Sequence, residues 1–165
     1  LNAVRDADVI SAALIEGPAV GGGAELSTSC DFRVMTPSAY CQFVHGRLGV
    51  SPGWGGLGRL VAIVGRANAL KLLGSSRRLE AEEALRWHFA DAIVTQETDP
   101  DIFIREYLQP YSEHPFPSAL KNLKNAIVES VAVVEKNNKL RKQEELFAFE
   151  RRWGGSDNKK ALSEK

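Results

Sequence analysis

Three consecutive glycines stand just before an acidic residue in the stretch AVGGGAELSTSCD, residues 19–31, and this pattern suggests binding of an oxyanion. The start of a helix leaves several backbone N–H groups without intrahelical partners and has partial positive charge. Glycines there let ligand atoms approach the backbone and allow a sharp turn from strand to helix. We therefore expect the N–H of Gly22 to face developing negative charge, with Glu25 close to it in the first helical turn.

The same glycines also fit a purely structural role. A glycine turn permits tight packing of a strand against a helix, and Glu25 is then an exposed carboxylate that the helix dipole favours. A run of glycines alone is a weak signal. The stretch is not a phosphate-binding P-loop, because no Gly-Lys-Ser or Gly-Lys-Thr follows it.

The elements around this turn are predicted to be short strands and one short helix. Residues 9–15, VISAALI, form an apolar and partly β-branched run that is typical of a buried strand. A helix of two turns begins at Gly22, and further strands are expected over 32–36 and 40–44. The segment 45–56, HGRLGVSPGWGG, is too rich in glycine and proline for regular structure and is predicted to be a loop.

The rest of the chain is predicted to be mostly helical. Two helical segments, LGRLVAIVG and RANALKLLG, are expected to stop at Gly65 and Gly74. A helix over 79–90 is rich in alanine, leucine and glutamate, and it leads into a short strand over 91–96. Three helices then follow over 100–108, 117–133 and 135–152, the last two separated near Asn137-Asn138.

This order of elements predicts an α/β core over residues 1–98 and a helical region over 99–165. Apolar residues of the helical region recur at helical spacing, which predicts one buried stripe. The stripe consists of Leu120, Leu123, Ile127, Val131 and Val134.

Composition limits the classes of protein that the sequence fits. The chain has 165 residues, 44% of them hydrophobic and 25% charged, which predicts a soluble globular unit. Twenty-one basic residues balance twenty-one acidic ones, which argues against a nucleic-acid or membrane partner. Cys30 and Cys41 show no metal-ligand spacing, so we expect a reducing, cytoplasmic compartment and no metal site. No apolar run approaches the roughly 20 residues of a membrane-spanning helix.

Motifs along most of the chain resemble the crotonase (enoyl-CoA hydratase/isomerase) superfamily. The glycine turn, CDFRVMTPSA, LGVSPGWGGLGRL, LLGSSRRLEAEEAL and the strand ADAIV occur in the order and spacing of that family. The resemblance covers residues 9–157 and implies a ClpP/crotonase-like spiral of β-β-α units with a helical C-terminal trimerisation region. It also implies an acyl-CoA substrate, no cofactor apart from the CoA of that substrate, and a homotrimer or hexamer.

The resemblance implies roles for particular residues. It places an oxyanion-hole amide on Gly22, with Gly21 and Gly23 beside it, and the first acidic residue of the hydratases on Glu25. The second catalytic glutamate of the hydratases falls on His45, which is a departure from their pattern. Hydration of a C=C bond in this family uses two carboxylates, so the hydratase interpretation is weakened.

The loop after His45 is expected to contact the substrate. Val50, Pro52 and Trp54 are interpreted as substrate-binding residues, although Trp54 also fits a role in packing the loop against the next helix. The segments FVHGRLGVSPGWGG and FERRWGG are most similar to members that remove the α-carboxylate from ethylmalonyl-CoA and methylmalonyl-CoA.

Decarboxylation requires a donor that stabilises the thioester enolate and a group that protonates it. We expect His45 to orient the carboxylate or the proton donor and Glu25 to act at the α-carbon, or the reverse assignment. The alternatives are an enoyl-CoA hydratase or isomerase with one carboxylate, and a noncatalytic protein retained for assembly or CoA binding.

The chain starts at Leu1 within the polar run LNAVRDAD, and its one methionine is Met35. We therefore expect it to be the C-terminal part of a longer polypeptide. By the family resemblance, the first oxyanion-hole amide and the first turns of the spiral belong to the preceding region. The chain alone is then predicted to be inactive and to fold only with that region as its partner.

Overall fold

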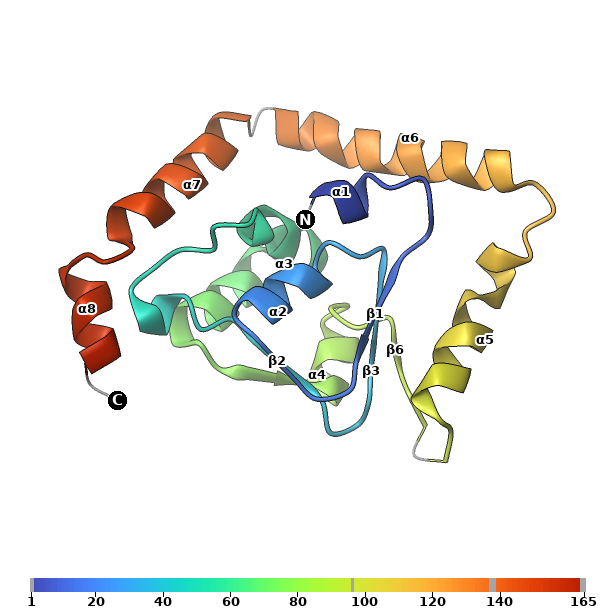
Figure 1. The fold of residues 1–165 in the computed structure, drawn as a ribbon, viewed down its shortest axis with the longest axis horizontal. Helices are drawn as coiled ribbons and strands as arrows, with labels where there is room; N and C mark the ends of the chain where they lie inside the picture. Colours follow the sequence, from blue (N-terminus) through green and yellow to red (C-terminus); the bar gives the residue numbers. More distant parts are fainter. Residues whose placement is uncertain (1, 96, 137–138, 164–165) are drawn as a thin grey trace.

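The computed structural model describes residues 2–95, 97–136 and 139–163, and Figure 1 shows their fold. The N-terminal part contains α1 (Asn2–Arg5), β1 (Ala12–Ile15), β2 (Pro18–Val20), α2 (Gly22–Ser27), β3 (Phe32–Met35), β4 (Tyr40–Gln42), the 3-10 helix η1 (Gly46–Leu48), α3 (Gly56–Ser75), β5 (Arg78–Glu80), α4 (Ala81–Arg86) and β6 (Ala92–Ile93). It is followed by α5 (Pro100–Ser112), α6 (Pro117–Lys136), α7 (Lys139–Arg152) and α8 (Ser156–Ser163), which form an arc around the core in Figure 1.

The strands form two small sheets. The first has the order β1-β3-β6 with all strands parallel, and Leu14 lies opposite Val34. The second has the order β2-β4-β5, in which β2 and β4 are parallel and β4 and β5 antiparallel. In the parallel pair Val20 lies opposite Gln42, so the carboxyl ends of β2 and β4 meet at the same edge. The residues that follow these two strands are therefore close in space.

The hydrophobic core lies between the sheets and the helices α3 and α4. Met35, Phe43, Leu60, Leu72 and Phe89 are fully buried there. The rings of Phe43 and Phe89 meet edge to face, with centroids 6.1 Å apart. Each such side chain contributes about 1.5–3 kcal/mol through its removal from water, so this cluster fixes the frame on which β4 and α3 sit.

The predicted α/β order is confirmed, with strands within 9–15, 32–36 and 40–44 and a helix that begins at Gly22. The predicted break at Gly65 is also confirmed, because its φ of 76° and ψ of 162° interrupt α3.

Other local predictions are wrong. The helix predicted over 79–90 occupies only Ala81–Arg86, because Leu79 is fully buried in β5 opposite Cys41. Pairing with β4 therefore outweighs the helical propensity of this segment. Helix α3 continues through Gly74 to Ser75, and the strand β2 and the helix α8 were not predicted. The expected break at Asn137-Asn138 lies outside the described residues.

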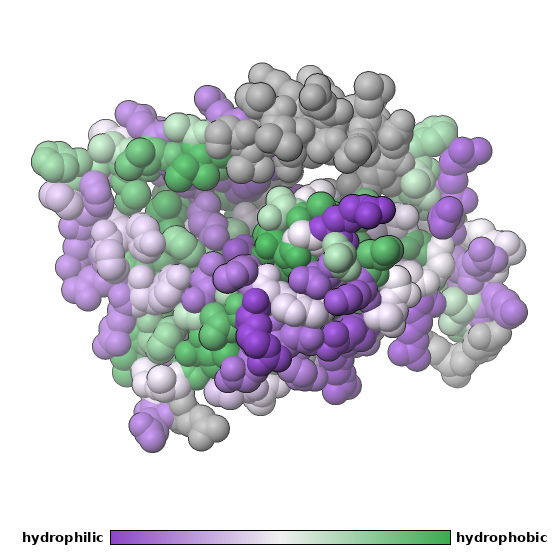
Figure 2. All heavy atoms as spheres, turned by 180° about the vertical axis from the view of Figure 1, so that it is seen from behind, coloured by the Kyte–Doolittle hydropathy of each residue, from purple (hydrophilic) through white to green (hydrophobic). Residues whose placement is uncertain are grey.

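The stripe predicted on α6 is not buried in the single chain. Leu120 is half-buried, whereas Leu123 is 58% exposed and Ile127 is 64% exposed. The side chains of Val131 and Val134 lie outside the described ones. In Figure 2, green hydrophobic residues are visible at the upper left, among hydrophilic ones. Helical spacing of apolar residues predicted a buried face, but the core of this chain does not cover it.

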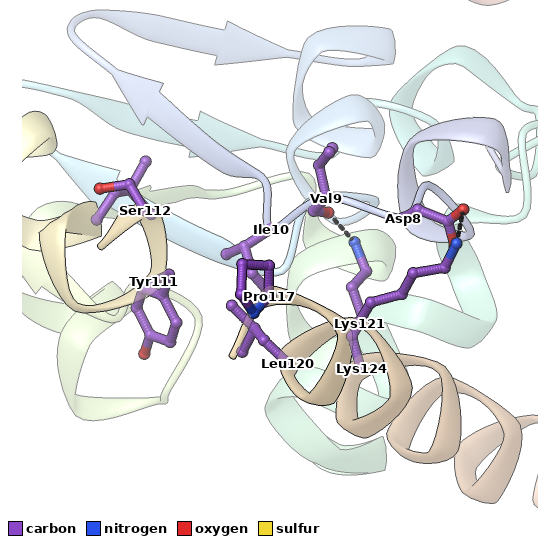
Figure 3. A pocket seen from close by; sticks show the side chains of 10 residues that line it. Asp8, Val9, Ile10, Tyr111, Ser112, Pro117, Leu120, Lys121 and Lys124 are labelled. Carbon is purple, nitrogen blue, oxygen red and sulfur yellow. Dashed lines mark hydrogen bonds and ion pairs between the residues drawn. The ribbon is translucent and has the colours of Figure 1, made fainter. Parts of the chain in front are cut away.

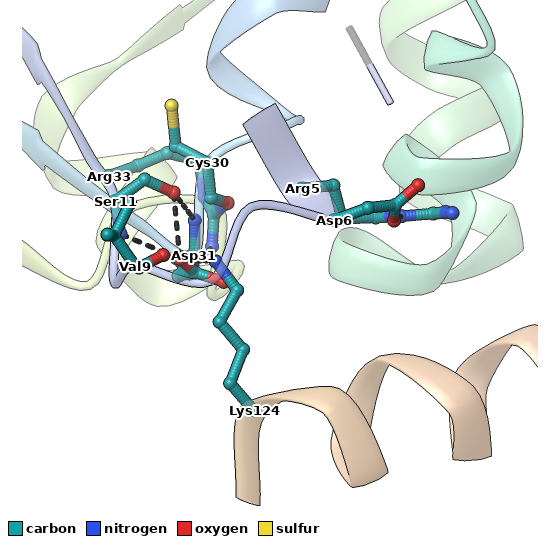
Figure 4. A network of polar contacts seen from close by, with 8 residues as sticks. All are labelled: Arg5, Asp6, Val9, Ser11, Cys30, Asp31, Arg33 and Lys124. Carbon is teal, nitrogen blue, oxygen red and sulfur yellow. Dashed lines mark hydrogen bonds and ion pairs between the residues drawn. The ribbon is translucent and has the colours of Figure 1, made fainter. Parts of the chain in front are cut away.

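Residues of α6 line a pocket of about 300 Å³, together with residues before β1 and residues of α5, as Figure 3 shows. Next to it, Lys124 donates hydrogen bonds to the carbonyl oxygen of Val9 and to Oδ2 of Asp31, the latter at 2.8 Å (Figure 4). The same Oδ2 atom accepts bonds from the N–H and hydroxyl groups of Ser11, both at 2.7 Å. This network ties α6 to the start of β1. The pocket is not lined by any of the predicted site residues.

The boundary at residue 98 between the α/β core and the helical region stays a prediction.

Among residues 2–95, 97–136 and 139–163, no helix is both long and apolar enough to cross a bilayer.

Candidate active site

The glycine turn is built as the sequence predicts. Gly21 has a φ of 55°, which favours glycine, and its N–H donates to the carbonyl oxygen of Gln42 at 2.9 Å. The carbonyl oxygen of Gly21 in turn accepts from the N–H of Glu25 at 3.0 Å, which closes the first turn of α2. In the part of the chain that the structure describes, the N–H of Gly22 has no hydrogen-bond partner. This donor is therefore available at the N-terminus of α2.

Glu25 is 2% exposed, which excludes the interpretation that it is an exposed first-turn carboxylate. Its Oε1 atom lies 2.8 Å from Nε2 of His45, and its Oε2 atom accepts from the N–H groups of Trp54 and Gly56, both at 3.1 Å. The carboxylate thus also lies at the N-terminus of α3, where the helix dipole favours an anion.

The pKa of Glu25 lies below its ordinary value. Burial raises this pKa, but the hydrogen bond from His45 and its electrostatic effect, together with the N–H groups of Trp54 and Gly56, lower it by more. Glu25 is therefore ionised near neutral pH.

His45 follows β4 and is 7% exposed. Because the ionised Glu25 can only accept a hydrogen bond, Nε2 of His45 must hold a proton and donate it. The other ring nitrogen, Nδ1, is buried and has no hydrogen-bond partner among the described residues. A buried polar atom without a partner costs about 1–3 kcal/mol, so Nδ1 is a candidate for contact with a further group.

Two glycines of the site are required by close approach of side chains. A Cβ atom on Gly22 would lie 2.6 Å from Cζ3 of the Trp54 indole. A Cβ atom on Gly56 would lie 2.5 Å from Oε2 of Glu25. The indole of Trp54 is 59% exposed, so it covers Gly22 from the solvent side. The absence of a side chain at Gly22 thus leaves space for the Trp54 indole, and at Gly56 it leaves space for the Glu25 carboxylate.

The structure brings four of the predicted residues together: Gly22, Glu25, His45 and Trp54. Gly21 and Gly23 flank this group, and Gly23 also faces a hollow beside β1. Val50 and Pro52 are buried within the loop that joins His45 to α3. The N–H of Val50 donates to the carbonyl oxygen of His45 at 3.0 Å, so Val50 helps to fix the backbone there.

Comparison with known proteins shows the family of this chain. Residues 1–152 match the enoyl-CoA hydratase/isomerase family. The chain belongs to this family. The ethylmalonyl-CoA decarboxylase of Xenopus laevis is 39% identical over 165 residues, which are 99% of this chain and 54% of the relative. The ethylmalonyl-CoA decarboxylase of Mus musculus is 36% identical over 159 residues, 95% of this chain and 48% of the relative. The chain thus spans about half the length of these curated relatives.

Solved structures of the enoyl-CoA hydratase/isomerase family share the fold. A putative enoyl-CoA hydratase from Streptomyces avermitilis has a TM-score of 0.86 at 22% identity, over 99% of this chain and 57% of that chain. The enoyl-CoA hydratase from Bacillus halodurans has a TM-score of 0.83 at 26% identity, over 99% and 64%. A putative enoyl-CoA hydratase from Thermobifida fusca YX, solved in complex with acetoacetyl-CoA, has a TM-score of 0.71 at 27% identity, over 87% and 58%. The predicted crotonase fold is therefore confirmed.

Arg59 is a member of the site that the sequence analysis missed. It is 6% exposed, and its Nε atom donates to the hydroxyl of Thr28 at 2.9 Å. Its Nη2 atom donates to the carbonyl oxygen of Trp54 at 3.1 Å and lies 3.5 Å from that of Glu25. Arg59 thus joins α2 to the loop before α3. A lone arginine in the otherwise apolar start of α3 was the signal that could have identified it.

Proposed function

We propose that this chain takes part in the decarboxylation of ethylmalonyl-CoA and methylmalonyl-CoA through a thioester enolate. The bond between the α-carbon and the carboxylate breaks, CO2 leaves, and the electron pair of that bond delocalises onto the thioester oxygen. A proton then adds to the α-carbon, so that ethylmalonyl-CoA yields butyryl-CoA. The names of the relatives support this substrate class.

The contact between Glu25 and His45 is the observation on which this proposal depends. An imidazole stands where the family resemblance places the second glutamate of the hydratases, and it lies 2.8 Å from Glu25. This pair contains one carboxylate, whereas hydration of a C=C bond in this family uses two carboxylates to activate water. The pair therefore does not suit hydration. It does suit a reaction that consumes one proton.

In this proposal the N–H of Gly22 donates to the enolate oxygen as it becomes anionic. It belongs to a turn whose geometry is fixed before substrate binds, so its orientation costs no reorganisation during the reaction. A single donor of this kind contributes roughly 2.7–4 kcal/mol. A second donor would come from residues outside this chain, in the half of the curated relatives that the chain does not span.

Glu25 and His45 have different roles in the remaining steps, which are orientation of the leaving carboxylate and protonation of the α-carbon. The carboxylate of Glu25 accepts three hydrogen bonds, which supports a role in holding the imidazole. His45 then orients the leaving carboxylate or supplies the proton to the α-carbon. The indole of Trp54 lies against Gly22, while Val50 and Pro52 support the loop that holds the indole.

The wider proposal follows the family. We propose that the substrate brings its own CoA, that no other cofactor is needed, and that the protein works in the cytoplasm as a homotrimer or hexamer. The exposed residues Leu123 and Ile127 are consistent with a helix covered by a second copy.

The test uses the full-length gene product that contains this chain. It is incubated separately with ethylmalonyl-CoA, methylmalonyl-CoA and crotonyl-CoA, and both CO2 release and hydration are followed. We expect CO2 from the first two thioesters and a loss of kcat of about 10²-fold or more in His45→Gln, because general acid–base groups contribute this much. Glu82→Gln, at an exposed position on α4, is the control.

Hydration of crotonyl-CoA without CO2 release would favour the hydratase or isomerase alternative. Unchanged turnover of every thioester in both Glu25→Ala and His45→Ala would remove the proposed roles of these residues. Binding of CoA without any turnover would favour a noncatalytic protein.

A further inference from the structure

We propose that Asn158, on α8, is a positioning residue for the candidate active site. It lies more than 100 positions after His45 in the sequence, yet it contacts the loop that follows His45. Together with Phe149 it forms a C-terminal clamp, defined here as these two side chains, on the segment 46–56. The catalytic consequence of the clamp rests on the function proposed above, whereas its effect on the loop does not.

The first contact of the clamp is at η1. Asn158 is 2% exposed, and its Nδ2 atom donates to the carbonyl oxygen of Leu48 at 2.6 Å. Its Oδ1 atom accepts from the N–H of Gly154 at 2.9 Å, so the amide is fixed at both ends. A Cβ atom on Gly49 would lie 3.1 Å from the backbone nitrogen of Asn158. A buried polar side chain with both ends paired to backbone atoms is a specific connection between α8 and η1.

The second contact of the clamp is in the middle of the loop. A Cβ atom on Gly53 would lie 3.1 Å from Cγ of the Phe149 ring, so this ring lies directly against the backbone. Phe149 is itself stacked on Trp153, with centroids 5.3 Å apart. The clamp therefore touches the loop immediately before Trp54.

The clamped loop holds the catalytic carboxylate. The N–H groups of Trp54 and Gly56 donate to Glu25, and Nη2 of Arg59, on α3, donates to the carbonyl oxygen of Trp54. The loop is therefore fixed by Arg59 from within the core and by the clamp from the C-terminal helices. Glycine-rich segments lose much conformational entropy on ordering, so contacts from outside the loop are needed to keep its donors aligned.

The test compares two matched pairs of variants in the full-length gene product. Asn158→Asp keeps the size and the acceptor but replaces the donor to Leu48 with an oxygen, and Lys159→Ala changes the next, exposed residue. Phe149→Ala removes the ring from Gly53, and Phe147→Ala removes an exposed ring from the same helix.

Hydrogen exchange of peptides is measured by mass spectrometry. We expect exchange over 46–56 to become about five- to tenfold faster in Asn158→Asp and in Phe149→Ala, because one local tie is lost in each. Exchange over β3 should stay unchanged, as should exchange of both regions in the two controls. In parallel, the acid limb of the pH profile of kcat/KM should move to higher pH in Asn158→Asp, because a loosened loop donates less well to Glu25.

Unchanged exchange over 46–56 in both clamp variants would overturn the proposal. An equal increase over the loop and β3 would also overturn it, because Asn158 would then serve general stability. If the loop responds as expected but no thioester releases CO2, the clamp stands and the proposed function fails.

Discussion

Replacement of Glu25 by glutamine tests the central feature of the site, which is a buried carboxylate held by one imidazole and two backbone N–H groups. Glutamine has nearly the same shape, so its oxygen can still accept from Trp54 and Gly56. Its NH2 group, however, faces Nε2 of His45, where the native carboxylate accepts a bond. Nε2 can accept from this NH2 group only if the imidazole proton moves to Nδ1, which is buried and has no partner among the described residues. The variant therefore loses the charge-assisted bond to His45 and the charge that strengthens the other two.

The expected loss follows from these contacts. Hydrogen bonds to charged groups contribute about 1.5–3 kcal/mol and neutral ones about 1 kcal/mol, so Glu25→Gln should lower the free energy of unfolding by about 3 kcal/mol at neutral pH. The pKa of Glu25 is lower in the folded protein than its ordinary value of 4.5. The stabilisation is therefore fully present above pH 4.5 and is lost as the pH falls through the folded pKa. The difference between native protein and variant should shrink accordingly.

The assay is urea unfolding of the full-length gene product at neutral pH and at several values below pH 4.5. Glu82→Gln is the control, because this exposed carboxylate on α4 should change the free energy of unfolding by less than about 0.5 kcal/mol. A difference between native protein and Glu25→Gln that stays constant or grows as the pH falls would refute the reasoning. It would show that Glu25 is not held as an anion.

Two further substitutions have matched controls. Gly56→Ala should destabilise the protein by about 1–3 kcal/mol in urea unfolding, because its Cβ would displace the Glu25 carboxylate. Gly58→Ala on the same helix has open space around its Cβ and should stabilise by up to about 1 kcal/mol, so equal effects would contradict the packing argument. Lys124→Met removes a buried ion pair and should lower the free energy of unfolding by about 2–3 kcal/mol. Lys121→Met, whose ion pair is exposed, should change it much less, and the reverse order would argue against the network of Figure 4.

Local pattern was sufficient for much of the fold. The run VISAALI contains β1, and the glycine turn leads into α2 at the predicted residue. Local sequence pattern predicted the wrong element where contact with a distant segment determines the conformation. Arg78–Glu80 forms a strand because Leu79 pairs opposite Cys41, nearly 40 positions earlier in the chain. Likewise, α8 is short and polar, and it is held by a contact with η1 that no periodicity reveals.

The site shows the same division between local and distant causes. The glycine pattern drew attention to Glu25 and the family resemblance to His45, but neither residue's neighbours in sequence indicate that the two side chains touch. They meet because β2 and β4 are parallel and in register, with Val20 opposite Gln42, so that the glycine turn and His45 leave the sheet at one edge. This is the general reason why sites form at the carboxyl ends of parallel strands.

Two glycines of the site lie against side chains that are distant in the sequence. Gly22 is tied to Trp54 and Gly56 to Glu25, each across about thirty residues of sequence. From the sequence, a glycine indicates only that no side chain is present. The structure shows that the Trp54 indole lies where a Cβ atom of residue 22 would be, and the Glu25 carboxylate where a Cβ atom of residue 56 would be. Because Trp54 and Gly56 both donate to Glu25, movement of the loop changes the donors of the carboxylate and the cover over Gly22 together. In the proposed reaction, enolate stabilisation and proton supply would therefore both depend on this one segment, and contacts on it from the C-terminal helices would affect both.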